Sequence, residues 1–400
     1  MNAFSKIDMA EVTRLTRAGK LAEAMALLQG RATPREAQTS PEPRASVSTR
    51  LISRQPPTAS PRPADHTAAR ADDEPAQSSA RFAQKLRALR KRLPRLGSLT
   101  GLREGASAPK VPVPDGARFE ERTFSNACGT RSYKVFAPSG YTGQPLPVVV
   151  MLHGCTQNPD DFALGTRMNE VAEEQNFLVV YPHQPQSANM KKCWNWFNAA
   201  DQRREGGEPS LIAGIALQAV EEFSADPARV YIAGLSAGGA AAAVLATTHP
   251  DIFAAAGVHS GLACGAATDM PSALAAMAGR GRLQSSAGPT VPTIVFHGDA
   301  DRTVHVVNGD HVVAQARPEA ALTEVVESGE TPDGMSYTRT VELDEAGGEV
   351  LEQWVLHGAG HAWSGGSANG SYADPRGPDA SREMIRFFLQ HRNGRVPARA

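Results

Sequence analysis

The chain has 400 residues, enough for one large domain and additional segments. Its 41 Lys and Arg residues nearly balance 42 Asp and Glu residues, which excludes the strongly basic composition of many nucleic-acid-binding proteins. Hydrophobic residues make up 41% of the chain, but no apolar run approaches the roughly 18 residues of a membrane span. We therefore expect a globular protein with neither a nucleic-acid partner nor a membrane span.

The first 116 residues differ in composition from the rest of the chain. Residues 1–30 carry apolar side chains at helical spacing up to a terminal glycine, which predicts a short helical stub. They lack the charged-then-apolar pattern of a signal peptide, which favours a cytoplasmic protein or export by an unusual route. Residues 31–116 begin with a stretch rich in Pro, Ser, Ala, Arg and Asp and predict a largely disordered linker.

One segment of this linker, residues 81–93, combines many basic residues with no acidic one. Phe82, Leu86, Leu89 and Leu93 fall on one face if the segment is helical. This pattern is typical of a helix that lies on an anionic or lipid-like surface. The alternative is a solvated, partly helical linker segment.

From about residue 117 to 393 the sequence alternates between strand-like and helical segments. The strand-like runs are 131–136, 147–152, 177–181, 230–233 and 293–296, and the helical stretches are 160–175, 208–224, 237–248, 304–316 and 380–391. The run 148–152 is apolar throughout, as in strands that are buried on both faces of a parallel sheet. The alternation predicts an α/β domain with a doubly wound, mostly parallel sheet and helices on both faces.

The sequence GLSAG at residues 234–238 stands where one of these strands meets a helix. It fits the G-x-S-x-G pattern, in which a sharp turn exposes a nucleophilic serine at the end of a strand. Ser236 is then the nucleophile, and the small residues around it suit a tight turn with a helix packed close behind. The alternative is a helix start in which Ser236 serves only as the cap.

A histidine base and an acid are expected in later strand-end loops, because active groups of an open parallel sheet collect at the carboxyl ends of its strands. His361 lies in a glycine-rich loop late in the chain and is the preferred base. Three other strand-end histidines suit structural roles equally well: His153, His297 and His357.

Two aspartates compete for the role of the acid. Asp301 lies beyond a tight glycine turn, from which a carboxylate can reach across to a histidine, and it is preferred. Asp299 suits a turn or a helix cap. The resulting order of serine, acid and histidine along the chain is that of α/β-hydrolases.

The proposed reaction also needs two backbone N–H groups to bind an oxyanion. One is that of Ala237, directly after the nucleophile, and the other is assigned to Cys155, in the turn after residues 147–152. Cys155 could also bridge to Cys193, and otherwise each is a small buried thiol. The four cysteines have no CxxC spacing, so no structural zinc site is expected.

Residues 193–197 read CWNWF in a chain with only four tryptophans. Trp194, Asn195 and Trp196 suit the wall of a substrate cleft, and core packing is the alternative because aromatic side chains bury a large area. Trp363, two residues after His361, is placed similarly.

With these motifs, the region from about 125 to 392 resembles the esterase family of poly(3-hydroxybutyrate) depolymerases, within the α/β-hydrolases. The motifs that carry the resemblance are HGCTQ at 153–157, CWNWF at 193–197, GLSAGG at 234–239, HGDAD at 297–301 and GHAWSGG at 360–366. The resemblance implies Ser236, Asp301 and His361 as catalytic residues and Cys155 in the oxyanion hole. It also implies a short-chain polyhydroxyalkanoate ester as substrate.

The expected protein is thus a serine ester hydrolase that uses neither a metal ion nor an organic cofactor. Because the family also resembles feruloyl and acetylxylan esterases, a plant cell-wall ester is the alternative substrate. A non-catalytic binding module with the same fold is the alternative from another class. Secreted depolymerases carry a polymer-binding domain after the catalytic one, whereas the additional segments here precede it. One hypothesis is that residues 81–93 hold the enzyme against a polymer granule or another amphipathic surface, and the solvated linker segment is the interpretation against which it stands.

Overall fold

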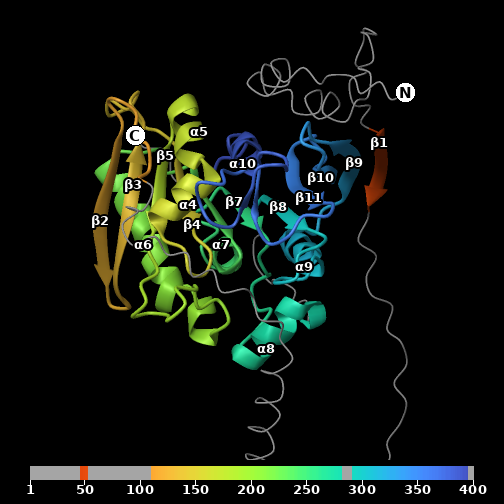
Figure 1. Ribbon diagram of the computed structural model, residues 1–400, viewed down its shortest axis with the longest axis horizontal. Helices are drawn as coiled ribbons and strands as arrows, with labels where there is room; N and C mark the ends of the chain where they lie inside the picture. Colours follow the sequence, from red (N-terminus) through yellow and green to blue (C-terminus); the bar gives the residue numbers. More distant parts are fainter. Residues whose placement is uncertain (1–45, 53–109, 282–290, 395–400) are drawn as a thin grey trace, which may run out of the picture. The chain divides into compact units, whose positions relative to one another are not determined.

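The structure is a computed structural model that describes residues 46–52, 110–281 and 291–394 (Figure 1). The predicted helical stub at residues 1–30 and the basic segment at residues 81–93 lie outside the described residues. None of the helices in the described part of the chain is long and apolar enough to cross a membrane.

An 11-stranded sheet runs through the described residues in the order β1-β9-β10-β11-β8-β7-β6-β4-β5-β3-β2. Its strands are β1 (Ser46–Ile52), β2 (Arg118–Asn126), β3 (Gly129–Ala137), β4 (Val148–Leu152), β5 (Leu178–Pro182), β6 (Val230–Leu235), β7 (Ala255–His259), β8 (Thr293–Gly298), β9 (Leu322–Glu330), β10 (Ser336–Leu343) and β11 (Glu349–Leu356). The central pairings from β5 to β11 are parallel, and those beyond them on both sides are antiparallel. Figure 1 shows β2 and β9 toward opposite ends of the sheet.

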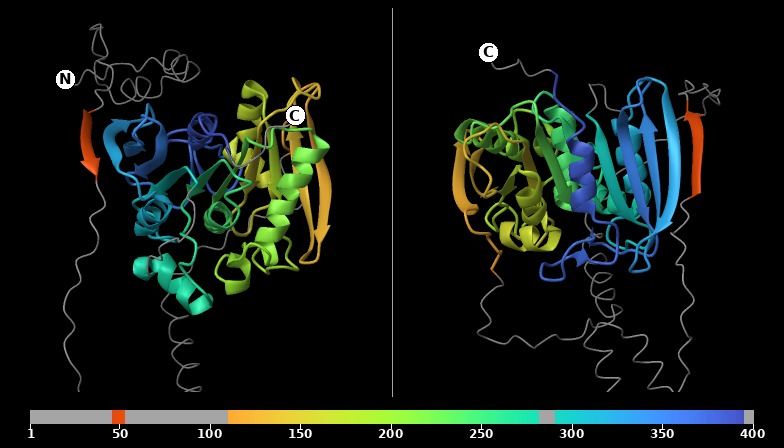
Figure 2. Two further views of the ribbon diagram at one scale, coloured as in Figure 1. Left: turned by 180° about the vertical axis from the view of Figure 1, so that it is seen from behind. Right: turned by 90° about the horizontal axis from the view of Figure 1, so that it is seen from above.

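Helices cover both faces of this sheet (Figure 2). One face packs against α6 (Gly207–Glu222), α7 (Ala237–Thr248) and α9 (Val307–Ala316), and the other against α4 (Pro159–Thr166), α5 (Met168–Gln175) and α10 (Ala380–Phe388). The remaining elements are η1 (Ala199–Gln202), α8 (Met270–Ala275), η2 (Ala276–Arg280) and the short strands β12 (Trp363–Ser364) and β13 (Ala373–Asp374), which pair with each other.

The apolar run of β4 is explained by this layering. Val148 and Val150 pack into the core beneath α6 and α7, whereas Val149 and Met151 pack into the core beneath α4, α5 and α10. Successive side chains of a strand point to opposite faces, so a strand with both faces covered must be apolar at every position. The expected mostly parallel sheet with helices on both faces is confirmed.

Several elements differ from the prediction. The single helix expected at 160–175 is two helices, because Arg167 adopts a left-handed conformation (φ 58°) and its N–H donates to the Ala163 carbonyl to close α4. β1 lies within the segment predicted as a linker, and its backbone pairs antiparallel with β9. The pattern also did not predict β2, β7, β9, β10 and α8.

Candidate active site

Ser236 lies at the sharp turn between β6 and α7. Its backbone has φ 58° and ψ −119°, a conformation that is rare for a residue with a side chain. Its N–H donates to the His259 carbonyl (2.9 Å), and its own carbonyl accepts the Ala240 N–H (2.9 Å). Its side chain is partly exposed. The turn therefore has the strained backbone of a nucleophile elbow rather than that of an ordinary helix cap.

The glycines of the elbow allow the backbone to pack tightly. A Cβ on Gly238 would overlap the Leu152 carbonyl at the end of β4, and one on Gly234 would overlap Gly238 itself. A Cβ on Gly154, in the turn after β4, would lie 3.7 Å from the Ser236 Cβ. The turn that contains Cys155 thus lies directly beside the candidate nucleophile.

The structure brings Asp301 and His361 together from the loops after β8 and β11. The Asp301 Oδ2 lies 2.6 Å from the His361 Nδ1, and the Asp301 side chain is fully buried. Gly298 permits this approach, because a Cβ there would overlap the Ala359 carbonyl of the other loop. The Ala300 N–H donates to that same carbonyl (3.1 Å) and joins the two loops.

Asp301 remains ionised in this buried position. Burial opposes its ionisation, but the interaction with His361, together with the backbone N–H groups of Val304 and Thr303, lowers the pKa of Asp301 below its usual 3.8. The backbone N–H groups of Thr303 (2.8 Å) and Val304 (2.9 Å) donate to its Oδ1. An ionised carboxylate that accepts the Nδ1–H of His361 leaves the Nε2 of that ring as the basic nitrogen.

The competing acid and histidine form a separate pair at the surface. His357 Nδ1 lies 2.9 Å from Asp299 Oδ2, and the two side chains are 43% and 39% exposed. The Asp299 Oδ1 also accepts the Gly358 N–H (2.7 Å), and the His357 Nε2 lies 2.9 Å from the Thr338 hydroxyl. Asp299 and His357 therefore link β8, β10 and the loop after β11.

His259, at the end of β7, links the serine turn to the histidine loop. Its carbonyl accepts the Ser236 N–H, and its Nε2 accepts the Ser364 N–H (3.0 Å), three residues after His361. Burial, with smaller contributions from His297 and His361, lowers the pKa of His259 to about 3, so the ring stays neutral and can accept this bond. His259 could not be recognised from the sequence, because it ends a short strand that carries no motif.

The two expected oxyanion donors are the N–H of Ala237, directly after Ser236, and the N–H of Cys155, in the turn beside it. Neither the Cys155 N–H nor the Ala237 N–H donates a hydrogen bond to another described residue. Cys155 and Cys193 form a disulfide, and the Thr156 N–H donates to the Lys191 carbonyl (2.7 Å). The turn after β4 is thereby joined to the loop that precedes η1.

The tryptophans expected to line a cleft are largely buried. Trp194 is 0% exposed and donates from Nε1 to the His153 carbonyl (3.1 Å). Trp363 is 1% exposed, donates to the Ser381 hydroxyl (3.1 Å) and stacks on His259 at 5.1 Å. The prediction that these two side chains contact substrate is corrected: both support the site from the core. Trp196 is 7% exposed, and Asn195 is partly buried.

A polar network behind the turn at 153–155 was also missed. Gln184 follows β5 and is 0% exposed, and Glu208 begins α6 and is 5% exposed. Both make hydrogen bonds to the CWNWF segment. No motif marks either residue. A glutamate in the first turn of a helix is also common, because its charge interacts favourably with the helix dipole, so Glu208 does not stand out in the sequence.

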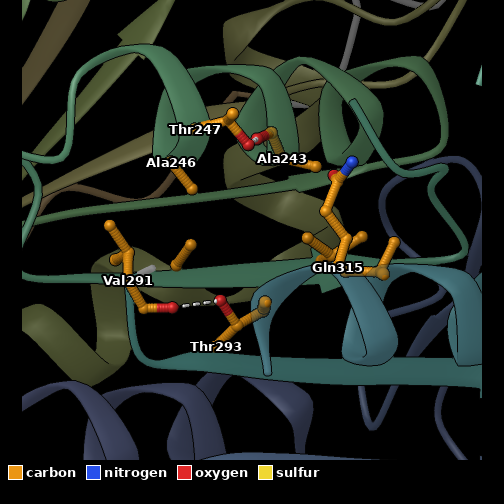
Figure 3. A pocket seen from close by; sticks show the side chains of 10 residues that line it. Ala243, Ala246, Thr247, Val291, Thr293 and Gln315 are labelled. Atoms are coloured by element: carbon orange, nitrogen blue, oxygen red, sulfur yellow. Dashed lines mark hydrogen bonds between the residues drawn. The ribbon is translucent and has the colours of Figure 1, made fainter. Parts of the chain in front are cut away.

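The cavity drawn in Figure 3 lies away from these groups, between the helices α7 and α9 and the strands β7 and β8. Ala243 lines it from α7, about two helical turns beyond Ser236. Its volume of about 20 Å³ corresponds to a single water molecule, so it is too small for an ester substrate. Within the described ranges, no group of three or more His, Cys, Asp or Glu side chains is arranged to bind a metal ion.

A serine elbow, a buried carboxylate and a histidine at strand ends of one parallel sheet place the protein among the α/β-hydrolases. Residues 131–327 match the model of the esterase PHB depolymerase family.

Individual relatives include two classes of esterase. Poly(3-hydroxyalkanoate) depolymerase C of Paucimonas lemoignei is 32% identical over 237 residues, 56% of this chain and 56% of that protein. A probable acetylxylan esterase A of Neosartorya fischeri is 28% identical over 203 residues, 46% of this chain and 54% of that protein. The chain thus spans about half the length of these relatives. A solved structure of acetyl xylan esterase from Aspergillus awamori shares the fold, with a TM-score of 0.51 and 19% identity over 68% of this chain and 99% of that one.

Proposed function

We propose that the chain is a serine ester hydrolase with Ser236 as nucleophile, His361 as general base and Asp301 as the acid that orients it. One observation carries the proposal: the buried carboxylate of Asp301 lies 2.6 Å from His361 Nδ1. The loop that contains this histidine is linked through His259 to the strained turn at Ser236.

In the first half of the proposed reaction, the Ser236 Oγ attacks the ester carbonyl carbon while its proton passes to the His361 Nε2. The oxyanion that forms accepts hydrogen bonds from the N–H groups of Cys155 and Ala237. Its collapse breaks the bond to the alcohol oxygen, which takes the proton from His361 and leaves an acyl-enzyme.

In the second half, His361 removes a proton from a water molecule that attacks the acyl carbonyl. The second tetrahedral intermediate is bound by the same two N–H groups. Its collapse releases the carboxylic acid and returns the proton to Ser236. No residue outside this set is needed for the proton transfers.

We propose a short-chain polyhydroxyalkanoate, or its oligomers, as the substrate. The support is the family match of residues 131–327 and the 32% identity to a poly(3-hydroxyalkanoate) depolymerase. The alternative is a feruloyl- or acetylxylan-type carbohydrate ester, which the 28% identity to an acetylxylan esterase favours.

A substrate panel tests this choice. Purified protein is assayed on 3-hydroxybutyrate oligomers, methyl ferulate and acetylated xylan, with Ser236→Ala as the blank. We expect kcat/KM on the oligomers to exceed that on the other two by at least about 10-fold, which corresponds to 1.4 kcal/mol of transition-state binding. A preference for methyl ferulate or acetylated xylan would overturn the substrate proposal and leave ester hydrolysis intact.

We also propose that residues 81–93 attach the enzyme to a polymer granule or a similar amphipathic surface. The support is their basic, acid-free composition and the apolar stripe described above. Deletion of 81–93 is expected to abolish co-sedimentation with polymer granules and to leave kcat/KM on a soluble ester unchanged. Unchanged co-sedimentation would rule the attachment out.

A further inference from the structure

Glu208 has unusual surroundings for a glutamate at the start of a helix. Its residue is 5% exposed, and its carboxylate accepts hydrogen bonds from two other segments. The Oε2 accepts the Asn195 N–H (2.6 Å), and the Oε1 accepts the Asn195 Nδ2 (2.7 Å) and the Gln184 Nε2. Among the described residues, two charged groups lie near it. The Arg131 Nη2 lies 3.8 Å from Oε1, and the Asp201 Oδ1 accepts the Glu208 N–H (2.9 Å).

Asn195 connects Glu208 to the loop of the disulfide. It follows Trp194 and Cys193, and its side-chain carbonyl accepts from the Asn189 Nδ2 (2.8 Å). The Oδ1 of Asn189 in turn accepts the Cys193 N–H (3.3 Å). The Glu208 carboxylate therefore fixes both the backbone and the side chain of the residue two positions after Cys193.

Gln184 connects the same carboxylate to the turn after β4. Its Nε2 also donates to the Cys193 carbonyl (3.0 Å), and its backbone N–H donates to the His153 Nε2 (3.2 Å). Because that nitrogen accepts, the His153 Nδ1 carries the proton and donates to the Gly154 carbonyl (2.8 Å). Burial lowers the pKa of His153 to about 4, which keeps the ring in this neutral form.

We propose that Glu208 is a positioning residue for the oxyanion hole: through Asn195 and Gln184 it fixes the turn at 153–155 in the orientation that presents the Cys155 N–H to the substrate. The inference rests on the proposed function, because it assigns a task to that N–H. Glu208 contacts neither substrate nor reacting atoms, and it acts only through the geometry of this donor.

A carboxylate is required at this position because three donors converge on its two oxygens. A glutamine at this position has the same shape, but its side chain carries one acceptor oxygen and one NH2 donor in place of two acceptor oxygens. That NH2 group would face a donor of Asn195 or Gln184. A buried donor without an acceptor is costly, so the loop shifts to relieve it. Sub-ångström shifts of an oxyanion donor are enough to reduce its effect on the transition state.

The test compares Glu208→Gln with Glu222→Gln, the same change in the same helix at a residue that pairs with Arg122 instead. Kinetics are measured on a soluble short-chain ester. We expect Glu208→Gln to lower kcat about 10- to 100-fold, less than complete loss of an oxyanion donor, with KM changed less than about 2-fold. The control Glu222→Gln is expected to retain the kcat and KM of the parent.

A pH profile separates positioning from a general loss of stability. Burial, together with the charge of Asp201, raises the pKa of Glu208 to about 6. Below that pH the carboxyl gains a proton and presents a donor to the donors of Asn195 and Gln184, so the turn is expected to lose the orientation that the carboxylate holds. The ratio of kcat/KM in the parent to that in Glu208→Gln is therefore expected to fall as the pH is lowered through about 6, and a ratio that does not change with pH would contradict the role of the carboxylate.

The outcomes distinguish the inference from the proposed function. If the parent hydrolyses esters and Glu208→Gln has the same kcat as Glu222→Gln, the role of Glu208 is overturned and the proposed ester hydrolysis is unaffected. A parent that hydrolyses no ester overturns the proposed function and this inference with it. If Glu208→Gln does not fold, Asn195→Ala removes one of the three donors, and it is expected to lower kcat about 3- to 10-fold at constant KM. An unchanged kcat in Asn195→Ala contradicts the role.

Discussion

Two aspartates lie two residues apart in the loop after β8, and their surroundings assign them different tasks. Asp301 is sealed from solvent and hydrogen-bonded to His361, whereas Asp299 is 39% exposed and bonded to His357. Sequence order alone leaves both as candidates. Burial favours Asp301 as the proposed acid, because a carboxylate that must stabilise an imidazolium acts most strongly away from water.

Asp301→Asn is expected to lower kcat on a soluble ester by about 10⁴-fold, since an amide at this position favours the wrong tautomer of His361. The control is Asp299→Asn, which is expected to leave kcat within about 2-fold because it disrupts only a surface pair. Steady-state kinetics of the two variants provide the comparison. A loss in Asp299→Asn as large as that in Asp301→Asn would contradict the assignment.

Trp363 illustrates a residue whose role depends on its burial. Trp363→Phe removes the hydrogen bond to Ser381 and part of the stack on His259. We expect the free energy of unfolding in urea to fall by about 2 kcal/mol and KM to stay unchanged. Tyr372→Phe is the aromatic control from the same loop, 48% exposed, with an expected change below about 0.5 kcal/mol. A higher KM in Trp363→Phe without loss of stability would show that the side chain contacts substrate.

At the scale of elements, the elbow depends on the close approach of β4, β6 and α7. Gly238→Ala places a methyl group into the Leu152 carbonyl, and backbone cannot move aside as a flexible side chain can. We expect it to lower the free energy of unfolding by about 3 kcal/mol and to displace Ser236. The measurement is urea unfolding.

Gly360→Ala is the control for that prediction, because a Cβ there meets no atom within 4 Å. Its unfolding free energy is expected to change by less than about 0.5 kcal/mol. Equal stability of Gly238→Ala and the parent would contradict the packing described for the elbow.

The ends of most central strands could be predicted from the sequence because each is an apolar run followed by a loop with polar residues. β7 is the exception, since its short run of Ala, Gly and Val carries no such signal. The run before Ser236 and the run before Asp301 both show this pattern, and the structure places both loops at the carboxyl edge of the sheet. Apart from β3, the outer strands could not be predicted in this way. β9 and β10 are mostly half-buried and mix charged with apolar side chains, so they lack an apolar run.

At the scale of the whole molecule, the site is assembled by contacts between distant segments. The hydrogen bond from Ser364 to His259 joins residues 105 positions apart, and the bond from Gln157 to Ser371 joins residues 214 apart. Motifs are local, so the sequence indicated Ser236 and His361 separately but not the residues that link their loops. Glu208 and Gln184 were missed for the same reason, since only the fold makes their burial visible.

The central claim is that Ser236 is an activated nucleophile. Its most direct test is incubation of the purified protein with a fluorophosphonate, followed by mass spectrometry of the digested chain. The account predicts one phosphonylated peptide, which contains Ser236 in the parent, and no labelling in Ser236→Ala. An unlabelled parent that is folded, or a label that persists in Ser236→Ala, would contradict it.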